Sequence, residues 1–161
     1  MLRPRIIPCL LLSDSGLVKT QNFSSPKYVG DPLNAVRIFN EKEVDELMVV
    51  DIDATTHGQE PDYSLISNIA SECRMPLCYG GGIKCADQVE KIISLGVEKI
   101  AISSAALCQN TFIKEASKRV GSQSLVAVLD IKRTGLMKNQ FTIFTHNGTK
   151  KIEDTLFTVL A

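Results

Sequence analysis

The chain has 161 residues, with 18 Lys and Arg against 18 Asp and Glu, so its formal net charge is zero. This balance excludes a broadly basic nucleic-acid binder, which needs excess cations to meet phosphates. A hydrophobic content of 44% excludes a disordered chain, and no apolar run approaches the roughly 18 residues of a membrane span. The length predicts one domain over residues 1–161, with room for a sizeable core.

The five cysteines are odd in number and form no C-x-x-C pair. Disulfide frameworks and zinc sites need paired or regularly spaced cysteines. We therefore expect reduced thiols in a cytoplasmic protein, with no metal and no cofactor. His57 lies in the polar segment THGQEPD, and His146 stands beside Asn147-Gly148. Neither histidine has metal-ligand spacing to the other, so both are predicted to be surface loop residues.

Short apolar runs rich in Val, Ile and Leu predict five β-strands. The runs show little polar alternation, which is typical of parallel strands covered on both faces. They lie at residues 5–12, 45–51, 75–79, 99–103 and 124–130. Phe141–Thr145 predicts a short additional strand, and Asn147-Gly148 predicts a turn after it.

Segments with helical spacing lie between these strands. The first opens at Asp31-Pro32, because Asp is a good N-cap and Pro suits the first helical position. Apolar stripes predict three further helices, at residues 65–69, 86–93 and 112–116. Gly96 and Gly121 suit the left-handed position that ends a helix. Residues 152–161 begin a fifth helix.

The alternation of strands and helices predicts parallel α/β architecture. An open, doubly wound five-stranded sheet fits the length, whereas a (β/α)₈ barrel fits the spacing but typically needs about 250 residues. Polar residues follow several strands in succession, which favours the active face of a barrel: Asp51, Gly80-Gly81-Gly82, Ser103-Ser104 and Asp130. The sequence therefore predicts a (β/α)₈ barrel truncated to about five βα units.

The glycine run and the serine pair suggest a phosphate site. Gly81 and Gly82 let backbone N–H groups approach an anion closely, because no Cβ intervenes. Ser103 and Ser104 would add hydroxyl and N–H groups near a helix N-terminus, which favours negative charge. The alternative interpretation is a tight turn beside an ordinary helix cap.

Asp130 is the best catalytic candidate, because a carboxylate at the mouth of an apolar strand is partly desolvated and suits acid–base work. The alternative is a helix cap or a surface ion pair with Lys132 or Arg133. Asp51 has the same location on its strand. Lys19 is a weaker candidate for substrate contact, since an exposed lysine is usually only solvated.

Charged residues at the other ends of three strands predict a salt-bridge ring. Arg5, Glu46 and Lys99 stand where strands begin, so they would meet at the N-terminal rim of a barrel. Charged residues at the N-terminal rim of a barrel usually stabilise the fold.

Several motifs resemble, in order, the cyclase subunit of imidazole glycerol phosphate synthase, the HisF family. They are RIIPCLLL, DELMVVDIDA, PLCYGGGI, GVEKIAISSAA and VGSQSLVAVLDIKR. The resemblance implies a (β/α)₈ barrel that works with a glutaminase partner. Ammonia from that partner would cross the barrel core and react at the far mouth with a phosphorylated ribulosyl carboxamide nucleotide, giving imidazole glycerol phosphate and an aminoimidazole ribotide.

The resemblance also implies roles for individual residues. Asp130 matches the catalytic acid, and Lys19 and Asp51 match active-face positions. The other matches are Gly82, Ser103 and Ser104 at a phosphate site, Arg5, Glu46 and Lys99 at an ammonia gate, and Glu98 and Gln123 on the partner-facing rim. The family usually has Asn-Thr where Ser103-Ser104 stands here.

This sequence departs from the family pattern in two ways. Leu11 occupies the position of the other catalytic aspartate, and leucine cannot exchange a proton. The segment PCLLL resembles a HisF-like branch linked to acetamidino sugars of surface polysaccharide. In that branch, the resemblance implies, the barrel passes ammonia to a separate sugar-modifying amidotransferase. Strands six to eight and the second phosphate site are also absent. We therefore expect either a fragment or sheet edges closed by another copy of the chain; a non-catalytic half-barrel scaffold is the remaining alternative.

Overall fold

The computed structural model describes residues 3–21, 24–108, 111–133 and 141–152. Five parallel strands form its centre: β1 (Cys9–Ser13), β4 (Leu47–Asp51), β5 (Leu77–Gly80), β6 (Lys99–Ile102) and β7 (Leu125–Ala127). An antiparallel hairpin, β2 (Gly16–Gln21) and β3 (Ser24–Gly30), extends the sheet beyond β1. The seven strands lie in the order β3-β2-β1-β4-β5-β6-β7, which confirms the predicted parallel α/β architecture of a truncated barrel.

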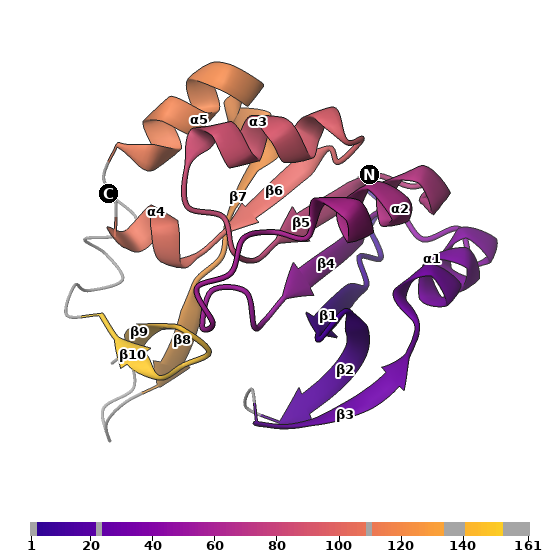
Figure 1. Cartoon of the computed structure of the whole chain (residues 1–161), viewed down its shortest axis with the longest axis horizontal. Coiled ribbons are helices and arrows are strands. Elements are labelled where there is room, and N and C mark those ends of the chain that lie inside the picture. The colour runs from indigo at the N-terminus through magenta and orange to yellow at the C-terminus, as the bar shows by residue number, and fades with distance from the viewer. Residues whose placement is uncertain (1–2, 22–23, 109–110, 134–140, 153–161) are drawn as a thin grey trace.

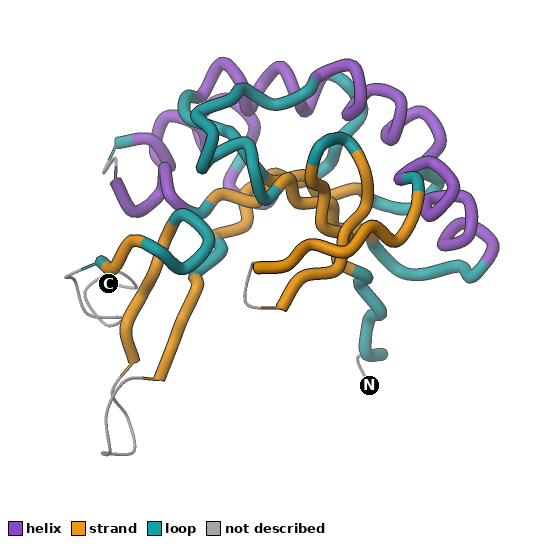
Figure 2. The backbone as a smooth tube through the Cα atoms, turned by 60° about the horizontal axis from the view of Figure 1, so that its bottom comes forward, coloured by secondary structure: helices purple, strands orange, loops and turns teal. Residues whose placement is uncertain are grey.

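The helices arch over one face of this curved sheet (Figures 1 and 2). They are α1 (Pro32–Glu41), α2 (Tyr63–Glu72), α3 (Ala86–Ser94), α4 (Ser104–Cys108) and α5 (Phe112–Val120), and a 3₁₀ turn, η1 (Ser122–Ser124), follows. The hydrophobic core lies between helices and sheet. Its fully buried side chains include Val36, Leu47, Val49, Ile66, Ile69, Val89, Ile92 and Ile100.

Three predicted helix ends are confirmed by capping contacts and backbone geometry. The side chain of Asp31 accepts a hydrogen bond from Asn34 N at 2.9 Å, and Pro32 occupies the first turn of α1. Gly96 and Gly121 have φ angles of +102° and +86°, so each ends its helix in the left-handed region that glycine favours.

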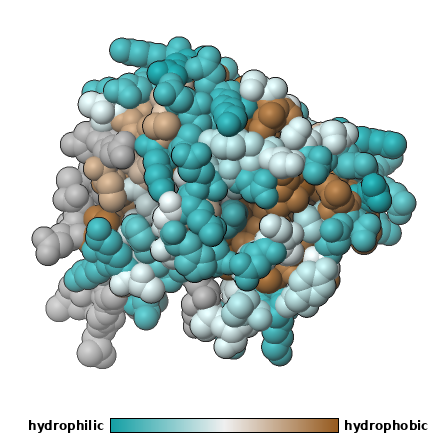
Figure 3. Space-filling view, in the orientation of Figure 1, coloured by the Kyte–Doolittle hydropathy of each residue, from teal (hydrophilic) through white to brown (hydrophobic). Residues whose placement is uncertain are grey.

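The other face of the sheet is concave and carries no described helix (Figure 2). Alternate strand residues point to it, since side chains on a strand alternate between faces. Leu11 and Val50 are therefore only half-buried, whereas their neighbours Leu12 and Val49 are buried. Apolar side chains also gather at the surface around β1 and β4 (Figure 3). The prediction that both faces are covered is confirmed for β5 and β6, where Cys78 and Ala101 of the concave face are buried. It is wrong for β1 and β4 in the described part of the chain, where Leu11 and Val50 stay partly exposed.

The largest differences from the predicted strand bounds are at β1 and β7. β1 begins only at Cys9, because Pro8 has no N–H to donate, although its carbonyl accepts from Met48 N at 2.9 Å. The predicted strand 124–130 is interrupted. β7 ends at Ala127, and Asp130 opens a separate strand instead of closing this one.

A second, three-stranded antiparallel sheet contains β8 (Asp130–Arg133), β9 (Phe141–Thr145) and β10 (Lys150–Lys151), in the order β10-β9-β8. The predicted strand over Phe141–Thr145 is confirmed, as is the turn, since Asn147 and Gly148 have φ angles of +57° and +75°. Neither β8 nor the β2–β3 hairpin was predicted. The predicted fifth helix lies outside the described residues after residue 152.

Within the described ranges, every helix is too short or too polar to cross a membrane.

Candidate functional site

A cavity of about 410 Å³ opens at the C-terminal ends of the parallel strands. Residues singled out in the sequence on four different chain segments meet in it: Asp51, Gly80, Gly81, Gly82, Ser103, Ser104 and Asp130. Carboxyl ends of parallel strands meet at one edge, which is where barrel enzymes build their active face. The floor and walls come from Cys9, Leu11, Met48, Val50 and Ala101 of the concave face.

Asp51 ends β4 and shapes the loop that follows. Its Oδ1 accepts hydrogen bonds from Asp53 N and Ala54 N, both at 2.9 Å. One oxygen of this half-buried carboxylate is thus committed to the loop backbone. The second oxygen is the one that a ligand can meet.

The glycine run lets two loops pack together. Gly81 has φ +119°, and a Cβ there would overlap the Asp51 carbonyl oxygen. Gly82 has φ +71°, a Cβ there would lie 3.0 Å from Gln59 O, and its N–H donates to Thr55 Oγ1 at 3.3 Å. Backbone geometry therefore requires glycine at both positions, and Gly82 N–H already has an intramolecular acceptor.

Ser103 and Ser104 follow β6, the strand next to β5, and also line the cavity. Both are half-buried, and their hydroxyls make no hydrogen bond to the described part of the chain. The Ser103 carbonyl accepts from Ala106 N at 3.1 Å and Leu107 N at 3.3 Å, which opens α4. This helix has five residues, so the partial charge at its start is smaller than the sequence pattern suggests. The two hydroxyls are the more direct donors to an anion.

Asp130 enters the cavity as the first residue of β8. Its carboxyl group is half-buried, and this desolvation raises its pKa above the ordinary value of 3.8. A raised pKa suits a carboxyl group that exchanges protons with a substrate. Lys132 and Arg133 are exposed further along β8, and neither lines the cavity.

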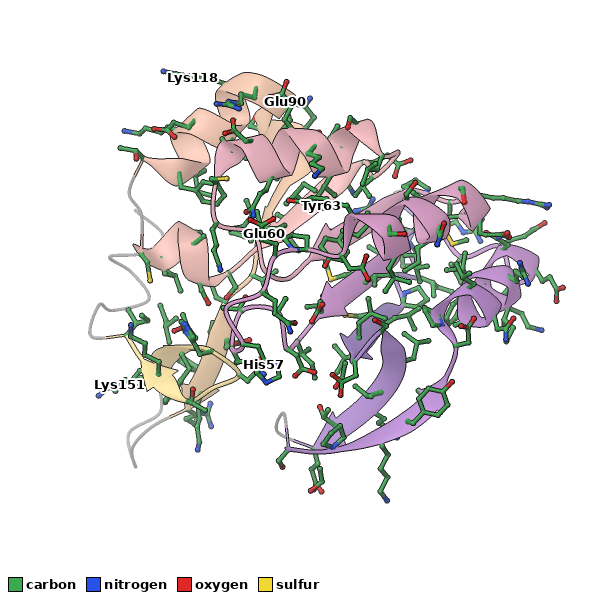
Figure 4. The ribbon with its side chains drawn as sticks, viewed as in Figure 1. His57, Glu60, Tyr63, Glu90, Lys118 and Lys151 are labelled. Carbon is green, nitrogen blue, oxygen red and sulfur yellow. The ribbon has the colours of Figure 1, made fainter. Side chains whose placement is uncertain are left out.

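His146 also lines this cavity, together with Asn147. Both belong to the turn between β9 and β10, and the side-chain amide of Asn147 donates to Ile52 O at 2.8 Å. The predicted loop position is confirmed for both histidines. His57 is exposed on the loop after β4 (Figure 4), whereas His146 is half-buried and lines the cavity, which was not predicted. Recognising the antiparallel β8–β9 pairing would have placed His146 near Asp130.

Lys84 is a second lining residue that the sequence reasoning missed. It directly follows the strand-end segment GGGI, and its Nζ donates to Gly58 O at 2.8 Å. Its position three residues after Gly81 was the available signal, because a lysine beside a glycine-rich loop commonly meets an anion.

Lys19 lies apart from the larger cavity. It is exposed on β2 and borders a neighbouring cavity of about 300 Å³. Cys9 and Leu11 line both cavities, so Leu11 stands at the boundary between them. Its isobutyl group makes this part of the wall apolar.

A charged cluster occupies the opposite end of the concave face. The buried carboxylate of Glu46 lies 2.7 Å from Lys99 Nζ and 3.3 Å from Arg5 Nη1. Glu46 is two residues before Met48 on β4, so both side chains point to the concave face and the cluster lies on the far side of Met48 from the cavity. We call these three residues the basal cluster.

A row of sulfur-bearing side chains follows Glu46 along the concave face. Cys9, Met48 and Cys78 lie in register on β1, β4 and β5, and Lys99 continues this row on β6. Burial, reinforced by the nearby Glu46 carboxylate, raises the pKa of Cys78 to about 12, so its thiol stays neutral. The concave face thus changes from charged to apolar to polar along its strands.

Glu98 and Gln123 lie near the starts of β6 and β7, on the same rim as the basal cluster. Both residues are exposed. Glu98 also has a structural contact, because its Oε2 accepts from Leu77 N at 2.6 Å.

The fold defines a protein of the (β/α)-barrel class, with polar residues gathered at the carboxyl ends of its parallel strands. Comparison with known families agrees: a model described as histidine biosynthesis protein matches residues 5–161. The chain belongs to this family, within its HisF members.

Three relatives illustrate the similarity. A Vibrio vulnificus (strain YJ016) protein, provisionally named imidazole glycerol phosphate synthase subunit hisF3, is 59% identical over 94% of this chain and 58% of its own length. A Leptospira borgpetersenii protein with the provisional name of subunit HisF is 56% identical over 94% and 59%. A Pseudomonas aeruginosa protein, provisionally hisF2, is 54% identical over 95% and 60%. The chain thus spans 58% to 60% of the length of these relatives.

Proposed function

We propose that the chain acts as a HisF-like synthase subunit of a glutamine-dependent amidotransferase. It receives ammonia from a glutaminase partner and passes it on for amidation of a sugar that is used in surface-polysaccharide synthesis. One observation carries this proposal: Asp130 and the suggested phosphate residues share one cavity, and the basal cluster lies beyond an apolar layer at the other end of the same concave face.

Each part of the concave face has a role in this proposal. Gly81, Gly82, Ser103 and Ser104 hold a substrate phosphate, supported by two serine hydroxyls beside the glycine loop that make no hydrogen bond within the described ranges. Asp130 exchanges a proton with the substrate, and its partial burial supports this role. Asp51 and Lys19 contact other polar groups of the substrate.

The basal cluster is the proposed ammonia gate. Arg5, Glu46 and Lys99 are held together by ion pairs, and the neutral side chains of Cys9, Met48 and Cys78 lie beyond Glu46, level with Lys99. Neutral ammonia crosses an apolar layer more easily than ammonium does, because burying a charge is costly. Glu98 and Gln123 on the same rim are proposed to contact the glutaminase.

Leu11 supports the sugar branch over a cyclase. A cyclisation with two carboxylates needs a second proton-exchanging group near Asp130, and an apolar side chain stands at the position where the HisF family has it. The second candidate is the cyclase subunit of imidazole glycerol phosphate synthase, which the names of the relatives favour.

Turnover of the ribulosyl carboxamide nucleotide with ammonium salt distinguishes these candidates. The variants are Leu11→Asp, which restores a carboxylate, and Leu11→Asn, which matches its size without its charge. We expect no imidazole product from the unchanged protein and from Leu11→Asn, and product from Leu11→Asp. Normal turnover by the unchanged protein would establish the cyclase instead.

A non-catalytic scaffold is the third candidate, and glutaminase binding separates it. Reversing the charge at Glu98 should weaken binding of the glutaminase while leaving phosphate binding intact, and Gly82→Val should do the opposite. Glutaminase binding without any phosphate binding would favour the scaffold.

We further propose that residues 1–161 form the N-terminal portion of a HisF-like barrel. The relatives are longer, and the edge strands β3 and β7 each have one described neighbour. Unpaired strand edges favour pairing with further strands, either of a longer chain or of a second copy. Light scattering during gel filtration measures the mass of the purified chain. A dimer mass would indicate that a second copy pairs with the edge strands, and a monomer mass would favour further strands of a longer chain. The five unpaired cysteines support a cytoplasmic location, where thiols stay reduced.

A further inference from the structure

His146 is placed at the candidate site by a docked turn. His146 and its neighbour Asn147 have φ angles of +53° and +57°. Residues other than glycine adopt this left-handed backbone conformation at a cost in free energy. The turn is closed by Thr149, whose N and Oγ1 both donate to His146 O. The amide of Asn147 then ties it to Ile52 O on the loop after β4. Local and tertiary hydrogen bonds thus hold an unfavourable backbone at the cavity.

The imidazole ring itself is anchored from one side. Its Nδ1 lies 3.1 Å from Oγ1 of Thr145, a side chain with no exposed surface. Since Nδ1 is engaged with this hydroxyl, Nε2 is the ring nitrogen left for a ligand.

Strand pairing brings this turn to the end of the ribbon where Asp130 lies. Asp130 pairs with Phe144 at the last pair of the β8–β9 ribbon, and His146 follows two residues later in the turn. Asp130, Val128 and His146 all line the cavity.

The cavity is lined by more carboxylates than cationic side chains, which disfavours binding of an anionic ligand. Among the residues that the structure describes, its titratable lining groups besides His146 are Asp51, Asp130, Lys84, Cys9 and Cys108. Two carboxylates thus face one ammonium, and Lys84 Nζ already donates to Gly58 O. A dianion such as a phosphate ester is repelled by the carboxylates, and a protonated imidazole is the group that offsets them.

We propose that His146 contacts the anionic group of the ligand and, as an imidazolium, makes anion binding at this site dependent on pH. This inference rests on the proposed phosphate site and adds to it a titrating contact from the hairpin. The ligand class is a phosphate ester, held by the serine hydroxyls on one side and by His146 Nε2 on the other.

Sulfate is a suitable probe, because its charge stays constant from pH 5.5 to pH 8 whereas that of phosphate does not. We expect calorimetry to show sulfate affinity about five-fold higher at the acidic end, the size of one charge-assisted contact at a partly exposed site. In His146→Gln, which keeps a hydrogen-bond donor, the rise should disappear. His57→Gln is the matched control, since His57 is exposed outside the cavity, and it should behave as the unchanged protein (Figure 4).

A further variant, Asp130→Asn, identifies the titrating group. The rise should persist in Asp130→Asn if His146 causes it. A rise that survives in His146→Gln, or that vanishes in Asp130→Asn alone, overturns the inference while leaving the phosphate site in place. Absence of sulfate binding in every protein at both pH values refutes the phosphate site itself, and this inference with it. Thermal unfolding checks that each variant is folded.

Discussion

The two faces of the central sheet are built from neighbouring residues and have opposite characters. On the helix-covered face, Leu12 and Val49 are buried in a continuous apolar core. On the concave face, their neighbours Leu11 and Val50 are half-exposed and form the wall of a cavity. The comparison teaches that the covered face supplies most of the stability, which leaves the concave face available for polar and charged groups.

The largest expected difference between the faces is at Leu12 and Leu11. Leu12→Ala should lower the free energy of unfolding by about 3–4 kcal/mol, because it leaves a void in a packed core. Leu11→Ala should cost less than about 1 kcal/mol, since its side chain borders open cavities. Urea unfolding monitored by circular dichroism measures both, and equal losses would contradict the division into two faces.

Gly81 tests whether the cavity loops tolerate a side chain. Gly81→Ala should cost about 2–3 kcal/mol, because the Cβ overlaps the Asp51 carbonyl and φ lies in the left-handed region. Gly58→Ala is the matched control. It has φ +68° with no atom near its Cβ, and should cost about 1 kcal/mol. The difference between their urea midpoints isolates the loop packing.

Glu46 tests the charged end of the concave face. Glu46→Gln should cost about 2 kcal/mol, because it leaves the ammonium of Lys99 and the guanidinium of Arg5 without their buried partner. Arg5→Gln should cost about 0.5 kcal/mol, since the arginine side chain is largely exposed. If Arg5→Gln costs as much as Glu46→Gln, the carboxylate is not the centre of the cluster.

The smallest expected effect is a gain in stability at Asp130. Burial raises the folded-state pKa of Asp130, so its stability contribution is greatest below the ordinary pKa of 3.8 and is lost as pH rises through the folded-state value. Asp130→Asn should therefore raise Tm by about 1–2 °C at pH 7 and leave it unchanged near pH 3. Calorimetric scans at the two pH values measure the change in Tm. A lower Tm for Asp130→Asn at pH 7 would contradict the idea that the half-buried Asp130 carboxylate destabilises the fold.

Several parts of the site could be anticipated from local pattern. Asp51, Gly82, Ser104 and Asp130 each follow an apolar run, and parallel strands bring such positions to one edge. The β2–β3 hairpin could not be anticipated in the same way. Its strands lie at the sheet edge, where six of the seven residues of β3 are exposed, so no apolar run marks them.

The sequence alone determined the strand–helix alternation, the helix caps at Asp31 and Gly96, and the polar ends of the strands, because these depend on residues close together along the chain. Only the tertiary structure decided that one face of the sheet is covered, that Asp130 opens a new strand, and that His146 reaches the cavity. These features depend on pairing between β8 and β9 and on a hydrogen bond from Asn147 to Ile52, 95 residues away. No local periodicity encodes contacts at that separation.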